Sequence, residues 1–237
     1  MQTAHSLCRI ISKRGIMSRK EAAKQIIAGN VLVNGKAVKS PGKIVHASSE
    51  ITIQGEKAEE KSKAYILLNK PANCITSRHD PEGRRTVYDI LKTKEWVFPA
   101  GRLDYDTSGL LIMTNDSELA DYITSPKSSL WKTYVAKIKG NIEPGELRQI
   151  ESGIMLDGEK TLPAKAKVLA ATGLSTRIEL QIREGRNRQA RRMLEALGKK
   201  VISLARTAIG ELQDAALKPG TYRKLSQEEI ALLKKER

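Results

Sequence analysis

The sequence predicts an α+β fold for this chain of 237 residues. Strand-like runs and short amphipathic segments alternate irregularly and never recur as a strand–helix unit of fixed length, which argues against a doubly wound parallel sheet. An Asn34-Gly35 dipeptide between two β-forming runs also marks an antiparallel hairpin, because both turn positions require positive φ. A chain of this length can bury a core without disulfide or metal staples.

The N-terminal residues predict a helix followed by a hairpin. Ser18 and Glu21 form the S-x-x-E pattern of a capping box, so a helix is expected to begin after Ser18. Gly29 can end this helix in the left-handed conformation. Short strands are then expected at residues 31–33, 36–38 and 51–53.

A segment of low apolarity separates this block from the rest of the chain. Residues 54–63, QGEKAEEKSK, contain no large apolar side chain and are predicted to be a linker. We therefore expect an N-terminal domain of residues 1–53 and a larger domain of residues 64–237. In the larger domain, strands are expected at 65–68, 133–139, 176–183 and 201–204, and helices at 87–92, 118–123, 145–152, 188–197 and from Ser226 onward.

The positive charge of the chain is concentrated in two blocks. Lys and Arg number 42 against 27 Asp and Glu, a net charge of +15. Residues 1–46 carry nine basic and one acidic side chain, and residues 183–206 carry eight basic and two acidic ones. A merely basic surface would spread its charge more evenly. The two blocks therefore indicate contact with a polyanion such as nucleic acid, since each phosphate contact requires a basic side chain.

Composition argues against several other classes of protein. No apolar run approaches the ~20 residues that a membrane span requires, and residues 1–10 lack the apolar core of a secretory signal. With two cysteines, Cys8 and Cys74, and three scattered histidines, neither a disulfide framework nor a zinc or copper site is expected. We expect a protein of the reducing cytoplasm.

Residues 101–109 are the first candidate for chemistry. Asp104 and Asp106 lie here with two hydroxyl side chains, between the apolar runs 97–98 and 110–113. Loops between buried strands often carry catalytic groups, because the scaffold fixes them and leaves them reachable. An Asp-rich turn whose side chains cap their own backbone is the alternative, and spacing alone leaves both open.

Two further segments are candidates for binding. In residues 183–193, Asn187 can cap a helix, and four arginines within seven residues repel one another unless an anion lies nearby; an ordinary surface helix is the alternative. Tyr134 shares a strand face with Ala136 and Ile138, so it is either core or a platform on which a base stacks.

These segments resemble, in order, the motifs of bacterial ribosomal RNA pseudouridine synthases of the ribosomal small-subunit pseudouridine synthase A family. The block from Ser6 to Gly42 resembles the small S-four-type RNA-binding module (the alpha-L motif), although it begins Leu-Cys-Arg-Ile where many members have Arg-Leu-Asp-Lys. The four motifs of the larger domain are similar to LLNKPANCITSRHDPEGRRTVYDIL, GRLDYDTSGLLIMTND, KTYVAKIKG and EGRNRQARRMLEALGKKVISLARTAIG.

The resemblance implies a mixed, mostly antiparallel central sheet with a cleft across its middle. It implies an enzyme that isomerises a uridine in ribosomal RNA to pseudouridine without cofactor or metal. Enzymes of both ribosomal subunits share these motifs, and we favour a 23S site over a 16S site only because that activity is common among such chains. Asp104, not Asp106, is the implied nucleophile, Tyr134 the base-stacking residue, and Arg191 the partner of Asp104. The expected partner is ribosomal RNA or an assembly intermediate, and the expected state is a monomer. The basic residues expected to contact RNA are Arg19, Lys20, Lys24, Lys36, Lys70, Arg102, Arg186 and Arg188.

Two rival functions remain open on the sequence. A non-catalytic ribosome-binding or RNA-binding protein explains both basic blocks, but gives no reason for Asp104, Tyr134 and Arg191 to occur together. An N-glycosylase could use Asp104 and Asp106 as a carboxylate pair. A glycosylase releases free base, so a product assay distinguishes it from an isomerase.

Overall fold

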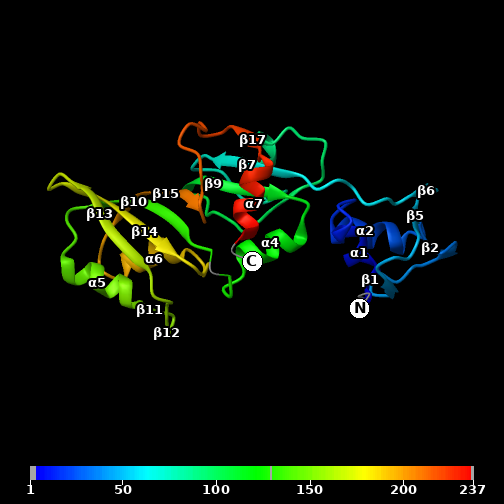
Figure 1. The fold of residues 1–237 in the computed structure, drawn as a ribbon, viewed down its shortest axis with the longest axis horizontal. Coiled ribbons are helices and arrows are strands. Elements are labelled where there is room, and N and C mark those ends of the chain that lie inside the picture. The colour runs from blue at the N-terminus through cyan, green and yellow to red at the C-terminus, as the bar shows by residue number, and fades with distance from the viewer. Residues whose placement is uncertain (1–3, 129, 236–237) are drawn as a thin grey trace. The chain divides into compact units, whose positions relative to one another are not determined.

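The computed structural model describes residues 4–128 and 130–235, and the chain divides into two compact units. Unit 1 consists of Met1–Ala64, Thr93–Phe98 and Thr114–Ser117. Unit 2 consists of Tyr65–Lys92, Pro99–Met113 and Glu118–Arg237. Figure 1 labels the helices and strands of both units.

Two helices and short strands make up the N-terminal part of unit 1. The helices are α1 (Leu7–Lys13) and α2 (Arg19–Ile27), and the strands are β1 (Ala4–Ser6), β2 (Val31–Val33), β3 (Lys36–Ala37), β4 (Ile44–His46), β5 (Ile51–Ile53) and β6 (Glu56–Lys57). One sheet has the order β3-β2-β5-β6, and β1 pairs with β4. The predicted helix start is confirmed, because Ser18 Oγ accepts a hydrogen bond from the Glu21 N–H at 3.0 Å.

Two tight turns shape the sheet of unit 1. Asn34 and Gly35 have φ values of 49° and 76°, as the predicted hairpin requires. Gln54 and Gly55 repeat this geometry, with φ values of 52° and 84°, and lead into β6. The first residues of the segment predicted as linker are therefore part of a hairpin. Their low apolarity reflects the exposure of a two-residue edge strand, and not a lack of structure.

A nine-stranded mixed sheet dominates the rest of the chain. Its main order is β13-β14-β10-β15-β9-β7-β17, with β16 beside β15 and β8 beside β9. The strands are β7 (Tyr65–Lys70), β8 (Phe98–Pro99), β9 (Thr107–Thr114), β10 (Lys132–Lys139), β13 (Lys165–Ala171), β14 (Ser175–Ile182), β15 (Val201–Ile209), β16 (Leu212–Gln213) and β17 (Tyr222–Lys224), and β11 (Met155–Leu156) pairs separately with β12 (Glu159–Lys160). The pairing of β15 with β9 is parallel, whereas β10 is antiparallel to both of its neighbours. The sheet is mixed and mostly antiparallel, as expected.

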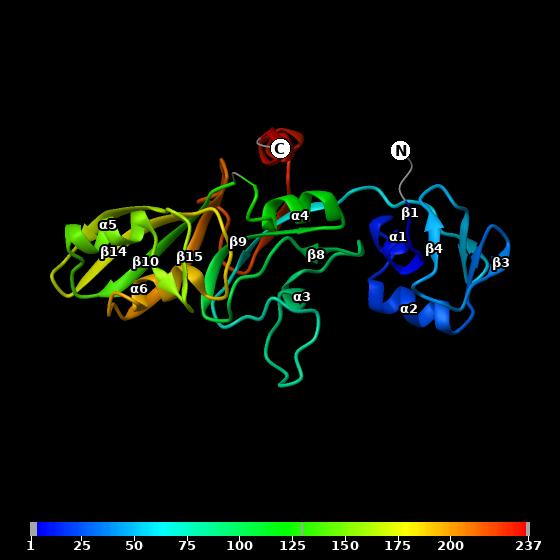
Figure 2. The ribbon, with the colours of Figure 1, turned by 90° about the horizontal axis from the view of Figure 1, so that it is seen from below.

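Five helices accompany this sheet in the described chain. They are α3 (Val87–Ile90), α4 (Ser117–Thr124), α5 (Pro144–Ser152), α6 (Gln189–Glu195) and α7 (Gln227–Lys235). Figures 1 and 2 show α5 and α6 alongside β10, β14 and β15, and α4 beside β9. Residues at alternate positions of β10, such as Ala136 and Ile138, share a buried core with Ile150 of α5 and Met193 of α6. This packing fixes α6 against the middle of the sheet.

The helix α6 begins differently from the prediction. Asn187 does not cap it; the N-cap is Arg188, whose φ of 49° is left-handed and whose side chain makes no capping bond. The Gln189 side chain instead accepts a hydrogen bond from the Arg186 N–H at 3.0 Å. The left-handed turn redirects Arg188, an uncommon conformation for a residue other than glycine.

The parallel pairing of β9 with β15 depends on one glycine. Gly109 lies opposite Arg206 and has a φ of 111°. A Cβ atom there would lie 2.1 Å from the Arg206 carbonyl oxygen, so the two backbones can approach only at glycine. This contact joins two segments almost a hundred residues apart and brings residues 101–107 to β15.

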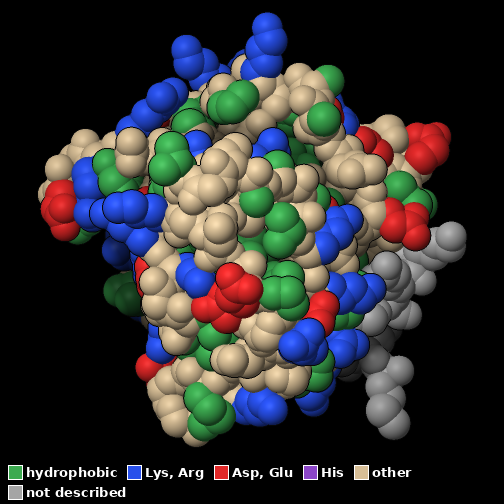
Figure 3. Space-filling view, turned by 90° about the vertical axis from the view of Figure 1, so that its left-hand side faces the viewer, with side chains coloured by type: hydrophobic (Ala, Val, Ile, Leu, Met, Phe, Trp, Pro, Cys, Tyr) green, Lys and Arg blue, Asp and Glu red, His purple; other side chains and the backbone are tan. Residues whose placement is uncertain are grey.

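Strand β13 forms an exposed edge of the sheet, away from this junction. Val168, Leu169 and Leu174 at this end of unit 2 are exposed. Figure 3 faces this end and shows Lys and Arg side chains bordering exposed hydrophobic ones. Hydrophobic residues that would otherwise mark core are thus found on the surface of this edge.

Candidate active site

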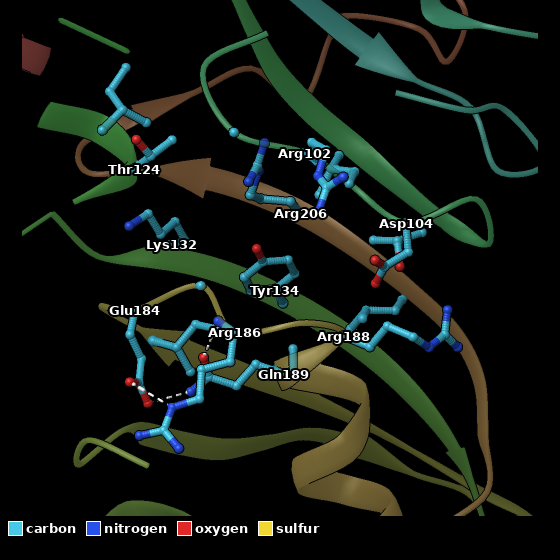
Figure 4. Close-up of a pocket in the computed structure, with 18 of the residues that line it drawn as sticks. Arg102, Asp104, Thr124, Lys132, Tyr134, Glu184, Arg186, Arg188, Gln189 and Arg206 are labelled. Carbon is cyan, nitrogen blue, oxygen red and sulfur yellow. Dashed lines mark hydrogen bonds and ion pairs between the residues drawn. The ribbon is translucent and has the colours of Figure 1, made fainter. Parts of the chain in front are cut away.

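A pocket of about 130 Å³ opens in unit 2 where residues 100–107, β10, β15 and the start of α6 meet (Figure 4). An apolar cavity of about 150 Å³ holds a benzene ring, so this space suits a single base ring. Its wall is rich in charged side chains. The polar and charged residues that line it are Arg102, Asp104, Thr107, Thr124, Lys132, Tyr134, Glu184, Arg186, Arg188, Gln189 and Arg206.

Asp104 presents a carboxylate without a partner to this pocket. Its backbone is fixed on both sides: Thr76 Oγ1 donates to the Leu103 carbonyl at 2.7 Å, and the Thr107 N–H donates to the Asp104 carbonyl at 3.1 Å. The side chain is half-buried, and within the described part of the chain its oxygens form no hydrogen bond or ion pair. A rigid, unpartnered carboxylate at a pocket wall is available to a ligand.

Asp106, two residues later, is fully engaged. Arg188 donates from both terminal nitrogens to its two oxygens at 3.0 Å, and Arg191 Nη2 lies 3.2 Å from Oδ2. The hydrogen bonds from Arg188 lower the pKa of the Asp106 carboxyl, and the charge of Arg191 adds to this effect. Two carboxylates in one loop thus have different environments, which is how active sites assign them different roles.

The position of Arg191 differs from the one that the resemblance implied. It contacts Asp106 and not Asp104. Arg188 and Arg191 are three residues apart at the start of α6, so both side chains can reach the same carboxylate, that of Asp106. Asp104 is left without an arginine partner as a result.

Tyr134 has a place in both the core and the pocket. It packs against the core of β10, β14 and α6, and it also lines the pocket. Tyr134 is on β10 and pairs with Arg206 of β15, at a point where the register shifts by one residue. β-bulges commonly redirect side chains next to active sites. In Figure 4 the ring lies in the pocket wall, with its hydroxyl directed toward Arg206.

Two buried cations that line the pocket were not predicted from the sequence as site residues. Lys132 and Arg206 are 6% and 5% exposed. Lys132 Nζ donates to the Arg183 carbonyl at 3.2 Å, and burial, with the charge of Arg206, lowers the pKa of Lys132 to about 8. Lys132 lies two residues before Tyr134, so strand alternation alone placed both on one face. The burial of Arg206 had no comparable signal.

Lys70 is a correction to the predicted RNA contacts. It is fully buried in unit 2, and its Nζ donates to the Pro71 carbonyl at 2.9 Å and the Tyr105 carbonyl at 3.5 Å. Burial lowers the pKa of Lys70 to about 8, although Asp104 and Asp106 oppose this. A side chain in this position supports the aspartate loop from inside and is inconsistent with a phosphate contact.

The other predicted RNA contacts divide into two kinds. Arg186 and Arg188 line the pocket but are held by Glu184 and Asp106. Arg102 also lines the pocket and is exposed. The remaining four are exposed on unit 1: Arg19, Lys20, Lys24 and Lys36.

Two features are absent from the described residues. Across residues 4–128 and 130–235, His, Cys, Asp and Glu side chains nowhere gather in threes that could hold a metal ion. Every helix in that part of the chain is too short or too polar to cross a membrane.

Two family models match the chain. Residues 64–196 match the RNA pseudouridylate synthase family, and residues 7–51 match the S4 domain. The chain is 44% identical to the ribosomal large subunit pseudouridine synthase B of Bacillus subtilis, over 96% of this chain and 95% of that one. It is 34% identical to the ribosomal small subunit pseudouridine synthase A of Escherichia coli, over 95% and 98%.

A solved structure is similar over almost the whole length of the chain. The crystal structure of a pseudouridylate synthase superposes with a TM-score of 0.71 at 35% identity, over 97% of this chain and 99% of that one. The family match spans the aspartate loop, Tyr134 and the start of α6. This chain therefore belongs to the RNA pseudouridine synthase family and carries an S4 domain at its N-terminal end.

Proposed function

We propose that the protein converts one specific uridine of ribosomal RNA to pseudouridine, with a large-subunit (23S) site favoured over a small-subunit (16S) site. The relative named for the large subunit is 44% identical and the one named for the small subunit 34%, which supports this preference. We also propose that the protein is a monomer, acts in the cytoplasm and requires no cofactor. Its substrate is ribosomal RNA or an assembly intermediate.

The proposed mechanism rests on the unpartnered carboxylate of Asp104. The target base must leave its stack to enter the pocket, which costs a few kcal/mol. Tyr134 then stacks on the uracil, and Asp104 acts either as the nucleophile at C1′ or as the base that removes a sugar proton. The N1–C1′ bond breaks, the uracil turns, and C5 bonds to C1′. Asp106, neutralised by two arginines, is unsuited to either role.

Basic side chains supply the RNA affinity in this proposal. Residues 1–53, with the hairpin strand β6 that pairs with them, act as the RNA-binding domain. The rest of residues 54–63 connects it, and residues 64–237 hold the catalytic site. The four exposed cations of unit 1 are accessible to phosphates. Lys24 also lies 3.8 Å from Glu21, but an exposed ion pair of this kind is weak and does not prevent a phosphate contact. Phosphate contacts of this kind offset the cost of extruding the base.

The function is tested by mapping pseudouridines in ribosomal RNA. A deletion strain should lose one pseudouridine, detected by chemical derivatisation and primer extension. The wild-type gene should restore it and the Asp104→Asn gene should not. An unchanged pseudouridine map contradicts the proposal. Release of free uracil from RNA by the purified protein would support the glycosylase alternative instead.

A further inference from the structure

Three buried donors at the pocket have unused hydrogen-bonding capacity. Arg206 Nε–H donates a hydrogen bond to the Leu110 carbonyl at 2.7 Å, but Arg206 Nη2 has no partner among the described residues. Thr107 is 1% exposed, and its Oγ1 also lacks a described partner. Lys132 uses one of its three donors, on the Arg183 carbonyl. All three residues line the pocket.

No described carboxylate forms an ion pair with these cations, although Asp104 lines the same pocket. Asp106 is occupied by Arg188 and Arg191. Glu184 accepts hydrogen bonds from Gln189 at 2.6 Å and from Arg186 at 3.2 Å. Within the described chain, neither Lys132 nor Arg206 forms an ion pair. Burying a charge without a counter-charge is costly. The retention of two such charges, Lys132 and Arg206, at one pocket therefore indicates a functional role.

Two of the donors, Lys132 and Arg206, lie beside the ring that the proposed function assigns to base stacking. Lys132 precedes Tyr134 by two residues on β10 and therefore shares its face, and Arg206 is its partner on β15. Figure 4 shows Lys132 and Arg206 on the same side of the pocket as the Tyr134 hydroxyl. A base stacked on Tyr134 would have its edge toward these donors.

We infer that Lys132, Arg206 and Thr107 form an oxygen-binding subsite that holds the carbonyl oxygens of the extruded uracil and stabilises negative charge on the base. This inference rests on the proposed function. A phosphate oxygen could satisfy the same donors, but the ring-sized pocket and the position of Tyr134 favour the base.

The chemistry explains why cations are suited to this position. When the N1–C1′ bond breaks, its electron pair leaves with the base, which becomes a uracil anion with charge shared among N1 and the two carbonyl oxygens. C5 then donates an electron pair to C1′, C5 loses its proton, and N1 gains one, so that atoms and charge balance. Preorganised donors in a water-poor pocket stabilise such developing charge more strongly than water does.

The first test compares Lys132→Met with Lys137→Met. Lys137 is an exposed lysine on the same strand, outside the pocket lining. Single-turnover pseudouridine formation at saturating RNA should fall about 100-fold in Lys132→Met, as when one oxyanion-hole donor is removed. The RNA dissociation constant should stay within about twofold, as for a group that acts on the transition state and not on binding. The melting temperature at pH 7 should rise, because a buried unpaired charge is gone. Lys137→Met should keep the wild-type rate.

The second test replaces the oxygens themselves. Target RNA is prepared with 2-thiouridine or 4-thiouridine at the modified position, since sulfur accepts hydrogen bonds weakly. One of the two analogues should slow the wild type and slow Lys132→Met much less, because the variant no longer donates to that atom. Arg206→Lys, which keeps the charge but moves the donors, should behave in the same way and provides a second variant.

The outcomes separate this inference from the function on which it rests. A wild-type protein that forms no pseudouridine overturns the proposed function and the subsite with it. An active wild type with an equally active Lys132→Met overturns the subsite alone. Weaker RNA binding with an unchanged rate at saturating RNA, or equal thio effects in variant and wild type, would assign the donors to phosphate and also overturn it.

Discussion

Residues 1–46 and residues 183–206 have similar net charges, +8 and +6, but the structure uses their cations differently. In the first block, the basic residues expected to bind RNA are exposed on unit 1. In the second, most cations are committed within unit 2. Their contacts are Arg186 with Glu184, Arg188 and Arg191 with Asp106, Arg192 with Asp157, and Lys199 with Glu146, while Arg206 is buried.

The difference shows what charge patterning in a sequence can indicate. A cluster of exposed, unpaired cations is available to phosphate, and long-range attraction follows from it directly. A cluster whose members each hold a carboxylate instead organises a site. The second block orders the aspartate loop and the start of α6, and by occupying Asp106 it leaves Asp104 free.

Asp104→Asn should have the largest effect. Asn is nearly isosteric but cannot act as a carboxylate nucleophile or base, so pseudouridine formation should fall at least ~10⁴-fold. RNA affinity should be unchanged or higher, because one negative charge is removed. Tritium release from ribosomal RNA carrying 5-³H-uridine measures the first quantity, and a binding titration at fixed salt measures the second. Robust tritium release, with the substitution verified by mass, would falsify the role of Asp104.

Asp106→Asn should have an intermediate effect through the second block. It removes the counter-charge of Arg188 and of the buried Arg191, whose side chain is 7% exposed. Because Asp106 itself is 39% exposed, we expect a loss of stability between the about 1 kcal/mol of surface pairs and the about 3 kcal/mol of buried ones. Turnover should be reduced but measurable, since Arg188 and Arg191 lose their position. Complete inactivity with retained fold would move the nucleophile to Asp106.

The pH dependence of stability gives a further check on Asp106. Its pKa is lowered mainly by the hydrogen bonds from Arg188. A carboxyl with a lowered pKa in the folded state stabilises the fold above its unfolded-state pKa, and this stabilisation is lost as pH falls through the folded-state value. Asp106→Asn should therefore lower stability at neutral pH and flatten its decline below about pH 4. Chemical denaturation from pH 7 to pH 2 measures both. Parallel curves for variant and wild type would show that the ion pairs do not contribute.

The sequence predicted those features that depend on neighbours in the chain. Ser18 with Glu21, and Ser226 with Glu229, cap helices because their partners are three residues away. Asn34-Gly35 forms its turn for an equally local reason. The fold class followed from the irregular alternation of strand-like and helical segments, and the mixed central sheet followed from the family resemblance. The observed sheet and the similar solved structure agree with both.

What the sequence missed depends on contacts between distant segments. Asp106 meets Arg188 across 82 positions of sequence, and the Arg206 side chain meets the Leu110 carbonyl across 96. These contacts follow from the parallel pairing of β9 with β15, which no local pattern encodes. For the same reason, the sequence predicted Lys70 to be an RNA-contacting surface cation, whereas Lys70 is buried on β7, which lies between β9 and β17 in the sheet.

Lys20→Gln with Lys36→Gln should have a smaller effect, confined to binding. Both lysines are exposed on unit 1, and removing one phosphate-binding cation should reduce the salt slope of RNA affinity by about 1. The double variant should bind more weakly, with a slope less steep by about 2, and should reach the wild-type rate at saturating RNA. Titrations at several salt concentrations measure the slope. An unchanged slope would show that these two residues do not bind RNA phosphates.

Arg192→Gln should have the smallest effect, although its charge belongs to the second block. Arg192 Nη1 donates to Asp157 Oδ2 at 2.8 Å, and Asp157 is 77% exposed. An exposed pair of this kind contributes about 0–1 kcal/mol, so the unfolding free energy should change little. Its guanidinium is held away from the pocket lining, so we also expect the same salt slope and the same rate. A slope reduced by about 1, as for a unit 1 lysine, would show that this arginine leaves Asp157 for a phosphate when RNA binds. The second block would then combine both uses of charge, and the contrast with the first would hold only for the residues that touch Asp106.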